Sequence, residues 1–326
     1  MKAKDFLASS AAMLSVSMIF ALILNVSGYF PDEILNAKRR ANLTVFILAT
    51  MMTVSLSRIP YKNLNPITHR KSVLRAVILG IFVAASIPIA GYLLMKNTSW
   101  SQYAVGLVFV AAAPFAASVV PLSYILRGDM EHAARGTIIV YVISLAWIPL
   151  VIYALLGESV EMKDVVITVV EIIGVPLVLS RLLTKVKIER ATMSIMMNLF
   201  ISFLVILSVG ATIFPSEATP LVLFALIAAL RTLGLGLGVE LSEKKIGIPW
   251  SQRVTDVLMV SYRNKGIAIA MCVAVLKGPA IGMAMVAIAT SIVIEICWVV
   301  FMDSYLFSKR RMKRELEREG SEVPQS

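Results

Sequence analysis

The hexapeptide Ser261-Tyr262-Arg263-Asn264-Lys265-Gly266 interrupts the middle of a hydrophobic stretch that runs from Asp256 to Leu276. It places two positive charges, an amide and a helix-weakening glycine where a lipid-spanning helix would be uniformly apolar. A charge near the bilayer centre costs at least ~2.5 kcal/mol on insertion scales, so it is tolerated only facing protein or a water-filled cavity. Non-helical backbone at that depth obeys the same condition. The interrupted stretch is therefore the strongest candidate for a functional site.

The composition of the whole chain indicates a membrane protein. Of its 326 residues, 58% are hydrophobic and only 16% are charged, and the mean hydropathy is +0.84. Soluble domains contain about 45–50% apolar and about 25% charged residues. Runs of about 18 or more mostly apolar residues are long enough to cross ~30 Å of hydrocarbon. The sequence predicts ten such spans, at residues 7–29, 41–57, 73–95, 103–126, 134–156, 165–183, 194–214, 219–240, 254–276 and 280–307.

The positive charges that give the chain its net charge of +11 are divided unequally between the two sides of a membrane, and this distribution does not indicate a nucleic-acid surface. With ten spans both termini share one side, which carries 22 of the 31 Lys and Arg residues, whereas the other side carries six. This bias predicts a protein of the cell membrane with both termini in the cytoplasm. The tail Lys309–Arg318 is interpreted as a solvated end that faces lipid headgroups, and no nucleic-acid partner is expected. The cluster Lys38-Arg39-Arg40 departs from the bias, for a reason that the sequence does not give.

The acidic loop Gly157–Asp164 divides the ten spans into five and five. An odd number of spans per half places the two halves in opposite membrane orientations. Inverted repeats of this kind are common in secondary transporters, whose sites lie near the midplane at discontinuous helices. The sequence therefore predicts a first five-helix repeat at residues 1–156, a second at residues 165–307, and a basic cytoplasmic tail at residues 308–326.

Helix-breaking residues occupy equivalent spans in the two halves. The fourth span contains Pro114 and Pro121, and the ninth contains the charged segment that ends at Gly266. A proline alone often only kinks a membrane helix, but two interrupted helices in matching spans indicate a central site. We therefore predict an all-α polytopic membrane protein of ten transmembrane helices in two inverted five-helix repeats, with broken fourth and ninth helices.

Two motifs in these spans resemble those of the bile acid:sodium symporter family. The fourth span contains Ala113-Pro114-Phe115-Ala116-Ala117-Ser118 and, further on, Ser123-Tyr124-Ile125-Leu126-Arg127-Gly128-Asp129, and the ninth contains Asn264-Lys265-Gly266-Ile267-Ala268. The resemblance implies crossed fourth and ninth helices in a core domain of spans 3–5 and 8–10, beside a panel domain of spans 1, 2, 6 and 7. It also implies transport of organic anions, such as bile acids and small carboxylates, usually with sodium.

The positions that the resemblance assigns to sodium binding are mostly changed in this chain. Sodium is a hard cation that needs oxygen ligands, which apolar side chains do not supply. We therefore expect the ordinary two-sodium coupling to be lost. The family's serine, asparagine, second serine, glutamate and glutamine fall on Val119, Val120, Ala133, Met259 and Arg263, whereas its threonine is kept as Thr137.

Lys265 or Arg263 is interpreted as a built-in cation in the region left by sodium. Such a cation would hold the crossed helices through backbone carbonyls and would attract an anionic substrate. A neutral Lys265 would permit coupling to protons. A structural ion pair of Lys265 with Glu171, Glu240, Asp256 or Glu295 stays open.

Three other intramembrane charges leave similar alternatives open. Arg231, in the eighth span, is placed to contact an anion or to pair with Glu295 or Glu171. Either glutamate is a candidate proton carrier or counter-ion. His69 and His132 are placed in cytoplasmic loops and interpreted as solvated.

The leading functional prediction is a secondary transporter of a small organic anion that works by alternating access. It is not expected to be an enzyme or to need a cofactor or a metal. The expected partners are the anion, the lipid bilayer and protons. The residues expected to contact substrate are Ser118, Ser123, Thr137, Asn264, Lys265 and Arg263.

Two alternatives stay open. The first is an efflux permease for arsenite or another oxyanion, because arsenite permeases share an Ala-Pro-Cys motif whose cysteine falls on Phe115, and because Cys272 lies in the ninth span. Residues 292–295 also look like the last helix of those permeases. The second is a transport-inactive ligand-binding sensor or a membrane enzyme, although no His-Glu-x-x-His or Gly-x-Ser-x-Gly motif is present in the spans.

Overall fold

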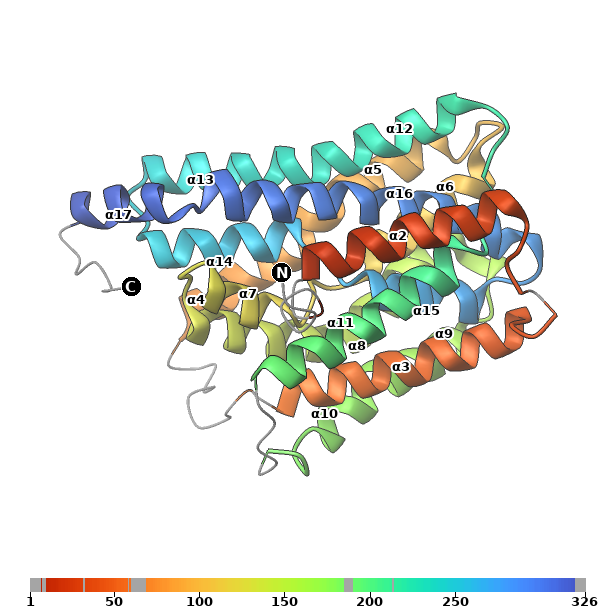
Figure 1. Cartoon of the computed structure of the whole chain (residues 1–326), viewed down its shortest axis with the longest axis horizontal. Coiled ribbons are helices and arrows are strands. Elements are labelled where there is room, and N and C mark those ends of the chain that lie inside the picture. The colour runs from red at the N-terminus through yellow and green to blue at the C-terminus, as the bar shows by residue number, and fades with distance from the viewer. Residues whose placement is uncertain are drawn as a thin grey trace.

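The computed structural model describes residues 7, 10–31, 33–57, 59, 69–184, 190–212 and 214–319. Within these ranges the protein is helical, and its extended pairing is limited to one bridge between Phe115 and Arg263. The helices lie roughly along one axis (Figure 1), as expected of a bundle that crosses a bilayer. The short helix α17 lies at one end of the bundle, and the turn between α2 and α3 lies at the other.

The first half of the chain forms α2 (Ser10–Ser27), α3 (Ala37–Ser57), α4 (Arg70–Val77), η2 (Ile78–Val83), α5 (Ala84–Met95), α6 (Ser101–Ala112), α7 (Val119–Ile125), α8 (Met130–Leu156) and η3 (Gly157–Ser159). The second half forms α9 (Met162–Val169), η4 (Val170–Gly174), α10 (Val175–Leu179), α11 (Arg190–Val209), α12 (Ala218–Ala229), η5 (Leu230–Gly234), α13 (Leu235–Lys245), α14 (Trp250–Ser261), α15 (Lys265–Val275), α16 (Pro279–Phe301), η6 (Met302–Leu306) and α17 (Lys309–Arg318). Here η2, η4, η5 and η6 are π-helical turns that continue their neighbouring α-helices, and η3 is a 3₁₀ turn.

The all-helical membrane fold predicted from the sequence is confirmed. Four continuous helices, Arg70–Met95, Met130–Leu156, Ala218–Lys245 and Pro279–Leu306, are long and apolar enough to cross a membrane. The other predicted spans coincide with shorter apolar helices or with helices in two pieces, such as α6 with α7 and α14 with α15. The number of ten crossings stays a prediction.

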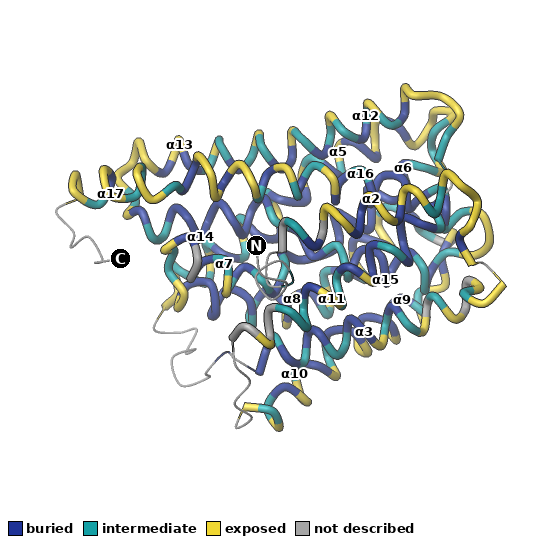
Figure 2. The backbone as a smooth tube through the Cα atoms, in the orientation of Figure 1, coloured by how far each residue is buried: buried dark blue, intermediate teal, exposed yellow. Residues whose placement is uncertain are grey.

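Burial follows the arrangement of the helices. Figure 2 shows buried backbone in the middle of the bundle and exposed positions on its outer faces. The helices α6, α14 and α15 are buried over most of their length. Large apolar side chains such as Ile19, Leu94 and Leu226 are exposed on the outside. An apolar outer surface is costly in water but fits a lipid environment, so the two interrupted helices are the interior of the bundle and the surrounding helices face lipid.

Candidate functional site at two crossed helix breaks

The first break separates α6 from α7. The residue after α6, Ala113, is extended, with φ −63° and ψ 138°. A residue before proline disfavours the α region, and Pro114 has no N–H group with which to continue the helix. The sequence also predicted a break at Pro121, but Pro121 lies within the first turn of α7, where a missing N–H group is tolerated.

The second break separates α14 from α15 at residues 262–264. Asn264 caps α15, because its side-chain oxygen accepts a hydrogen bond of 3.1 Å from the backbone N–H of Ile267. Gly266 was predicted as part of the break but lies in the first turn of α15. A Cβ atom at Gly266 would lie 2.2 Å from the side chain of Leu48, so this glycine lets α15 approach α3 closely.

The two breaks pair with each other. Phe115 and Arg263 form an antiparallel bridge. The N–H of Ala116 donates to the carbonyl of Tyr262 at 3.0 Å, and the N–H of Asn264 donates to the carbonyl of Pro114 at 2.8 Å. Buried backbone groups without partners are costly where water is absent. Each interrupted helix therefore supplies the hydrogen bonds that the other has lost, which holds them together at their crossing.

A tyrosine of α8 forms hydrogen bonds with both interrupted segments at this crossing. The hydroxyl of Tyr141 donates to the carbonyl of Phe115 at 3.0 Å and accepts from the side-chain amide of Asn264 at 2.8 Å. Tyr141 is fully buried. The same Asn264 side chain thus caps α15 and links both breaks to α8, so the backbone geometry of the crossing is tightly determined.

Charged side chains converge on Glu295 of α16 beside the breaks. Its Oε1 accepts from Nζ of Lys265 at 2.7 Å, from the guanidinium of Arg231 on η5, and from the backbone N–H of Arg263 at 3.3 Å. Glu295, Arg231 and Arg263 are each at most 3% exposed. In this cluster the cationic groups of Lys265 and Arg231 bind one carboxylate, which Arg263 contacts through its backbone N–H.

The two arginines bind the open carbonyl ends of the interrupted helices. The guanidinium of Arg263 donates to the carbonyl of Ala111, in the last turn of α6, at 2.7 Å, and also to the carbonyl of Gly80 on η2. The guanidinium of Arg231 donates to the carbonyl of Ser261, the last residue of α14, at 2.9 Å. The last carbonyls of a helix lack partners and carry partial negative charge. A fixed cation therefore stabilises each half-helix end.

The remaining predicted site residues have varied environments. Ser118 is half-buried at the end of the first break. Ser123 is buried on α7, and its hydroxyl accepts from Thr255 at 3.3 Å. The hydroxyl of Thr137 donates to the carbonyl of Ala133 at 2.8 Å within α8. Glu171 is exposed on η4 and lines a cavity that contains none of the break residues. The structure therefore brings together Asn264, Lys265, Arg263, Arg231 and Glu295, but not Glu171.

Four of the six positions that the resemblance assigns to sodium ligands are filled by apolar side chains. Val119, Ala133 and Met259 have no exposed surface and belong to one apolar cluster with Phe115, against which Val120 also packs. Among the described residues, no group of three or more His, Cys, Asp or Glu side chains has the arrangement of a metal site. This cluster offers no side-chain oxygen to a hard cation.

A second buried charge cluster was not predicted. His132 was interpreted as solvated, but it is 1% exposed, and its Nε2 lies 2.9 Å from Oδ1 of Asp256. Nε of Arg75 donates to Oδ2 of Asp256 at 2.5 Å, and its Nη2 donates to Glu243. Nδ1 of His132 lies 2.6 Å from the hydroxyl of Ser72. A usable signal was that Arg75 and Asp256 fall inside the predicted spans although they carry charge.

These features define an all-helical, multi-pass membrane protein with a buried charge cluster at two crossed helix breaks. The Sodium Bile acid symporter family matches residues 45–224, more than half of the chain, and the protein belongs to that family. Members of this family are transporters rather than enzymes. The matched region includes the first break but ends before the second, so Arg263, Lys265 and Glu295 lie outside it. No protein in a curated set matches the chain.

Proposed function

We propose that the protein is a secondary transporter of a small organic anion that works by alternating access without the usual sodium coupling. The observation that carries this proposal is the excess of cations at the crossed breaks. Of the three, only Lys265 has a side chain as much as 11% exposed. Glu295 holds its ammonium group at the start of α15, where the N-terminal helix dipole also favours an anion.

The direction of the helices supports a fold of two inverted repeats. In Figure 1, α4 to α5 and α12 to α13 run in opposite directions, as do α6 to α7 and α14 to α15. The equivalent third and eighth spans each contain a π-helical turn, η2 and η5, and both turns contact the break before α15. We therefore propose repeats at residues 1–156 and 165–307, with spans 1, 2, 6 and 7 as the panel and spans 3–5 and 8–10 as the core.

The bound arginines support a mechanism without the usual sodium coupling. In discontinuous membrane helices, unwound carbonyls and half-helix C-termini commonly coordinate the coupling ion. In this chain the guanidinium groups of Arg263 and Arg231 donate hydrogen bonds to the corresponding carbonyls of α6 and α14. A permanent cation stabilises the crossing, so no sodium ion has to bind or leave there. Protons are the coupling ions that this proposal favours, with Lys265 and Glu295 as their carriers.

The proposed substrate contacts are Lys265, Asn264 and Ser118, because all three lie at the breaks and retain polar atoms there. Arg263 is proposed to act through its charge, since its guanidinium already binds two carbonyls. The hydroxyls of Ser123 and Thr137 are engaged with protein partners, as are the amide of Asn264 and the ammonium of Lys265, so contact with substrate requires a conformation that releases them.

We also propose a location in the cell membrane with both termini in the cytoplasm. The asymmetry of Lys and Arg between the two sides supports this orientation. The basic helix α17 then lies on the cytoplasmic side, and the turn between α2 and α3 lies on the outside.

Lys265→Ala tests the proposed function. The purified protein is heated with a panel of small carboxylates and sulfonates, in sodium buffer and in choline buffer. A ligand at ~100 times its dissociation constant should stabilise the wild type by about 2.7 kcal/mol, equally in both buffers. Lys265→Ala should fold but lose this stabilisation and lose anion flux in proteoliposomes. The matched control is Lys277→Ala, because Lys277 is an exposed lysine that pairs with Glu161 at the surface.

Three results would overturn parts of the proposal. Wild-type flux in Lys265→Ala would remove the site assignment. Stabilisation by sodium itself would remove the fixed-cation mechanism. Binding of an anion without flux would indicate a sensor instead of a transporter. The arsenite alternative gains no support from the structure, because Cys272 is buried with its Sγ 3.9 Å from the carbonyl of Ile281, about two turns along α15 from Asn264.

A further inference from the structure

Glu171 differs from the other charges at the centre of the predicted spans. Arg231 and Lys265 both pair with Glu295, whereas Glu171 makes no hydrogen bond or ion pair with any residue that the structure describes. Its side chain is exposed on the π-helical turn η4, a kind of turn that is frequent at functional sites. An ionisable side chain within a membrane span is costly and commonly marks a functional site. Glu171 therefore indicates a partner that the described part of the chain does not supply.

Glu171 lines a cavity of about 560 Å³ toward the end of the bundle opposite α17. Asp164, Thr168 and Glu171 line it from one face of α9 and η4, because residues at i, i+4 and i+7 point the same way on a helix. Asn42 and Val45 of α3 form a second wall, and the end of α15 with the start of α16 forms a third. Ligand pockets commonly measure about 300–1,000 Å³, so this cavity is large enough for a small molecule.

Thr168 adds an unused hydroxyl group one turn before Glu171. It is only 5% exposed, and its hydroxyl has no hydrogen-bond partner among the described residues. The hydroxyls of Thr137 and Thr290, by contrast, donate to the carbonyl four residues earlier in their helices. A buried hydroxyl without a partner is costly. Because Thr168 borders the cavity, its hydroxyl is available to a ligand there.

The charges that line the cavity favour a cation. The lining contains two carboxylates, Asp164 and Glu171, and one ammonium group, that of Lys277. Lys277 pairs with Glu161 at 2.6 Å on the exposed rim, so its charge is already matched by a carboxylate outside the lining. A cavity with excess negative charge repels anions and raises the local concentration of cations.

We propose that this cavity binds a primary organic ammonium ion with an apolar body, and that Glu171 is its ion-pair partner. The inference goes beyond the proposed transport function and does not depend on it. A primary ammonium group has three N–H donors. The carboxylate of Glu171, the hydroxyl of Thr168 and the amide oxygen of Asn42 are oxygen acceptors on the walls of the cavity. Hydrogen bonds between two charged groups are the strongest of these, so Glu171 contributes most of the recognition.

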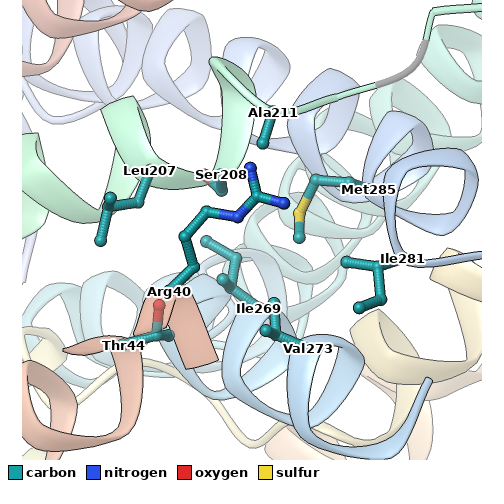
Figure 3. A pocket seen from close by; sticks show the side chains of 9 residues that line it. All are labelled: Arg40, Thr44, Leu207, Ser208, Ala211, Ile269, Val273, Ile281 and Met285. Atoms are coloured by element: carbon teal, nitrogen blue, oxygen red, sulfur yellow. The ribbon is translucent and has the colours of Figure 1, made fainter. Parts of the chain in front are cut away.

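The apolar body of the ligand has its own contacts in the cavity. Val273 of α15 and Ile281 of α16, both labelled in Figure 3, line the wall that faces α3 and α9, and Val45 and Ile167 add apolar surface from those two helices. A six-carbon ring places methylene groups against these side chains while its ammonium group contacts Glu171. Burial of each methylene group should tighten binding about fourfold. The ligand would join helices that lie far apart in the sequence, so it should raise the unfolding temperature.

The test uses the full-length protein in nanodiscs of zwitterionic lipid, titrated with cyclohexylammonium in a calorimeter, with empty nanodiscs as the reference for partition into lipid. We expect saturable binding that is at least about 10-fold tighter than the binding of cyclohexanol or cyclohexanecarboxylate. Glu171→Gln should weaken the binding of cyclohexylammonium at least about 10-fold, and Thr168→Val should weaken it about fivefold. Thermal unfolding without ligand shows that each variant is folded.

The matched control is Glu33→Gln, because Glu33 is an exposed glutamate at the same end of the bundle that does not line the cavity, and this variant should bind as the wild type does. Equal affinity of the wild type and Glu171→Gln for cyclohexylammonium would overturn the proposal. Equal affinity for cyclohexanol would also overturn it, because the cavity would then recognise hydrocarbon alone. Lys265→Ala should bind cyclohexylammonium normally, whatever its anion flux, and loss of binding in that variant would move the ligand to the crossed breaks.

Discussion

Arg263 shows how one side chain can bind backbone carbonyls from two different segments. Its guanidinium contacts a carbonyl at the end of α6 and a carbonyl on η2, while its own backbone pairs with Phe115 across the crossing. A planar fork of donors suits two carbonyls from different helices, and a lysine ammonium does not reproduce that geometry. The resemblance assigns a sodium-binding glutamine to this position, so in the proposed mechanism the arginine both replaces a ligand and supplies the charge.

Arg263→Gln introduces the glutamine that the resemblance assigns to this position. The loss of two charged hydrogen bonds to buried carbonyls should lower the free energy of unfolding by about 1.5–3 kcal/mol or more. Sodium should not restore it, because Val119, Ala133 and Met259 remain apolar. Thermal unfolding in sodium and choline buffers measures both effects. The control is Arg318→Gln, at an exposed arginine. Sodium-dependent stability of Arg263→Gln would contradict the fixed-cation mechanism.

The sequence predicted the charged break but not the partners of its charges. Charges within an apolar stretch are rare in membranes, so Arg263 and Lys265 stood out at once. Four carboxylates were candidate partners for Lys265, and the structure pairs it with Glu295. The distance of Glu171, Glu240 and Asp256 from Lys265 depends on how η4, α13 and α14 pack. Local periodicity carries no information about that packing.

At the scale of helices, residues of four elements meet in an ion-pair cluster. Arg75 of α4, His132 of α8, Glu243 of α13 and Asp256 of α14 lie together, far along the chain from one another. The sequence placed His132 in a loop because the predicted fifth span began at residue 134, whereas α8 begins at Met130. The Asp129 side chain caps that helix by accepting from the N–H of His132 at 2.9 Å. Because α8 begins four residues earlier than predicted, His132 lies in the helix and is buried rather than solvated in a loop.

A substitution in this cluster should test how strongly it joins the helices. Asp256→Asn removes the charge that faces both Arg75 and His132, and loss of one member of a buried pair typically costs about 3–5 kcal/mol. We expect a large fall in unfolding temperature, measured in detergent at neutral pH. The matched control is Glu131→Gln, whose partner Arg135 lies one turn away and whose side chain is 64% exposed. That pair should contribute at most about 0.5 kcal/mol. Equal stability of both variants would show that the cluster is not a structural link.

At the scale of the whole molecule, the hydrophobic pattern predicted the helical class and the segments that form helices. Hydropathy alone averages over a break of a few residues, so the breaks between α6 and α7 and between α14 and α15 were predicted from Pro114 and from the charged segment instead. Hydropathy did not predict that Arg40 of α3 lies beside residues of α11, α15 and α16 (Figure 3). A contact between distant helices is a property of packing, so only the unusual arginine was visible in the sequence.

The basic helix α17 is docked on the bundle rather than wholly solvated. Glu315 accepts from Lys244 of α13 at 2.5 Å and from Arg253 of α14 at 2.9 Å. Burial raises the pKa of Glu315, but the hydrogen bonds from Lys244 and Arg253 outweigh burial and hold its pKa below the ordinary value. A depressed folded-state pKa stabilises the docked form fully above the unfolded value of about 4.3, and this contribution is lost as the pH falls through the folded-state pKa.

We therefore expect the backbone amides of α17 to be protected from hydrogen exchange at neutral pH and to lose part of that protection below about pH 4.3. Glu315→Gln should exchange about fivefold faster at neutral pH, the factor that corresponds to about 1 kcal/mol, and should show no further acid-dependent loss. Glu317→Gln serves as the control, because Glu317 is exposed on the same helix and should leave the wild-type profile unchanged. An identical acid-dependent loss of protection in Glu315→Gln would show that another group controls the docking of α17 onto α13 and α14.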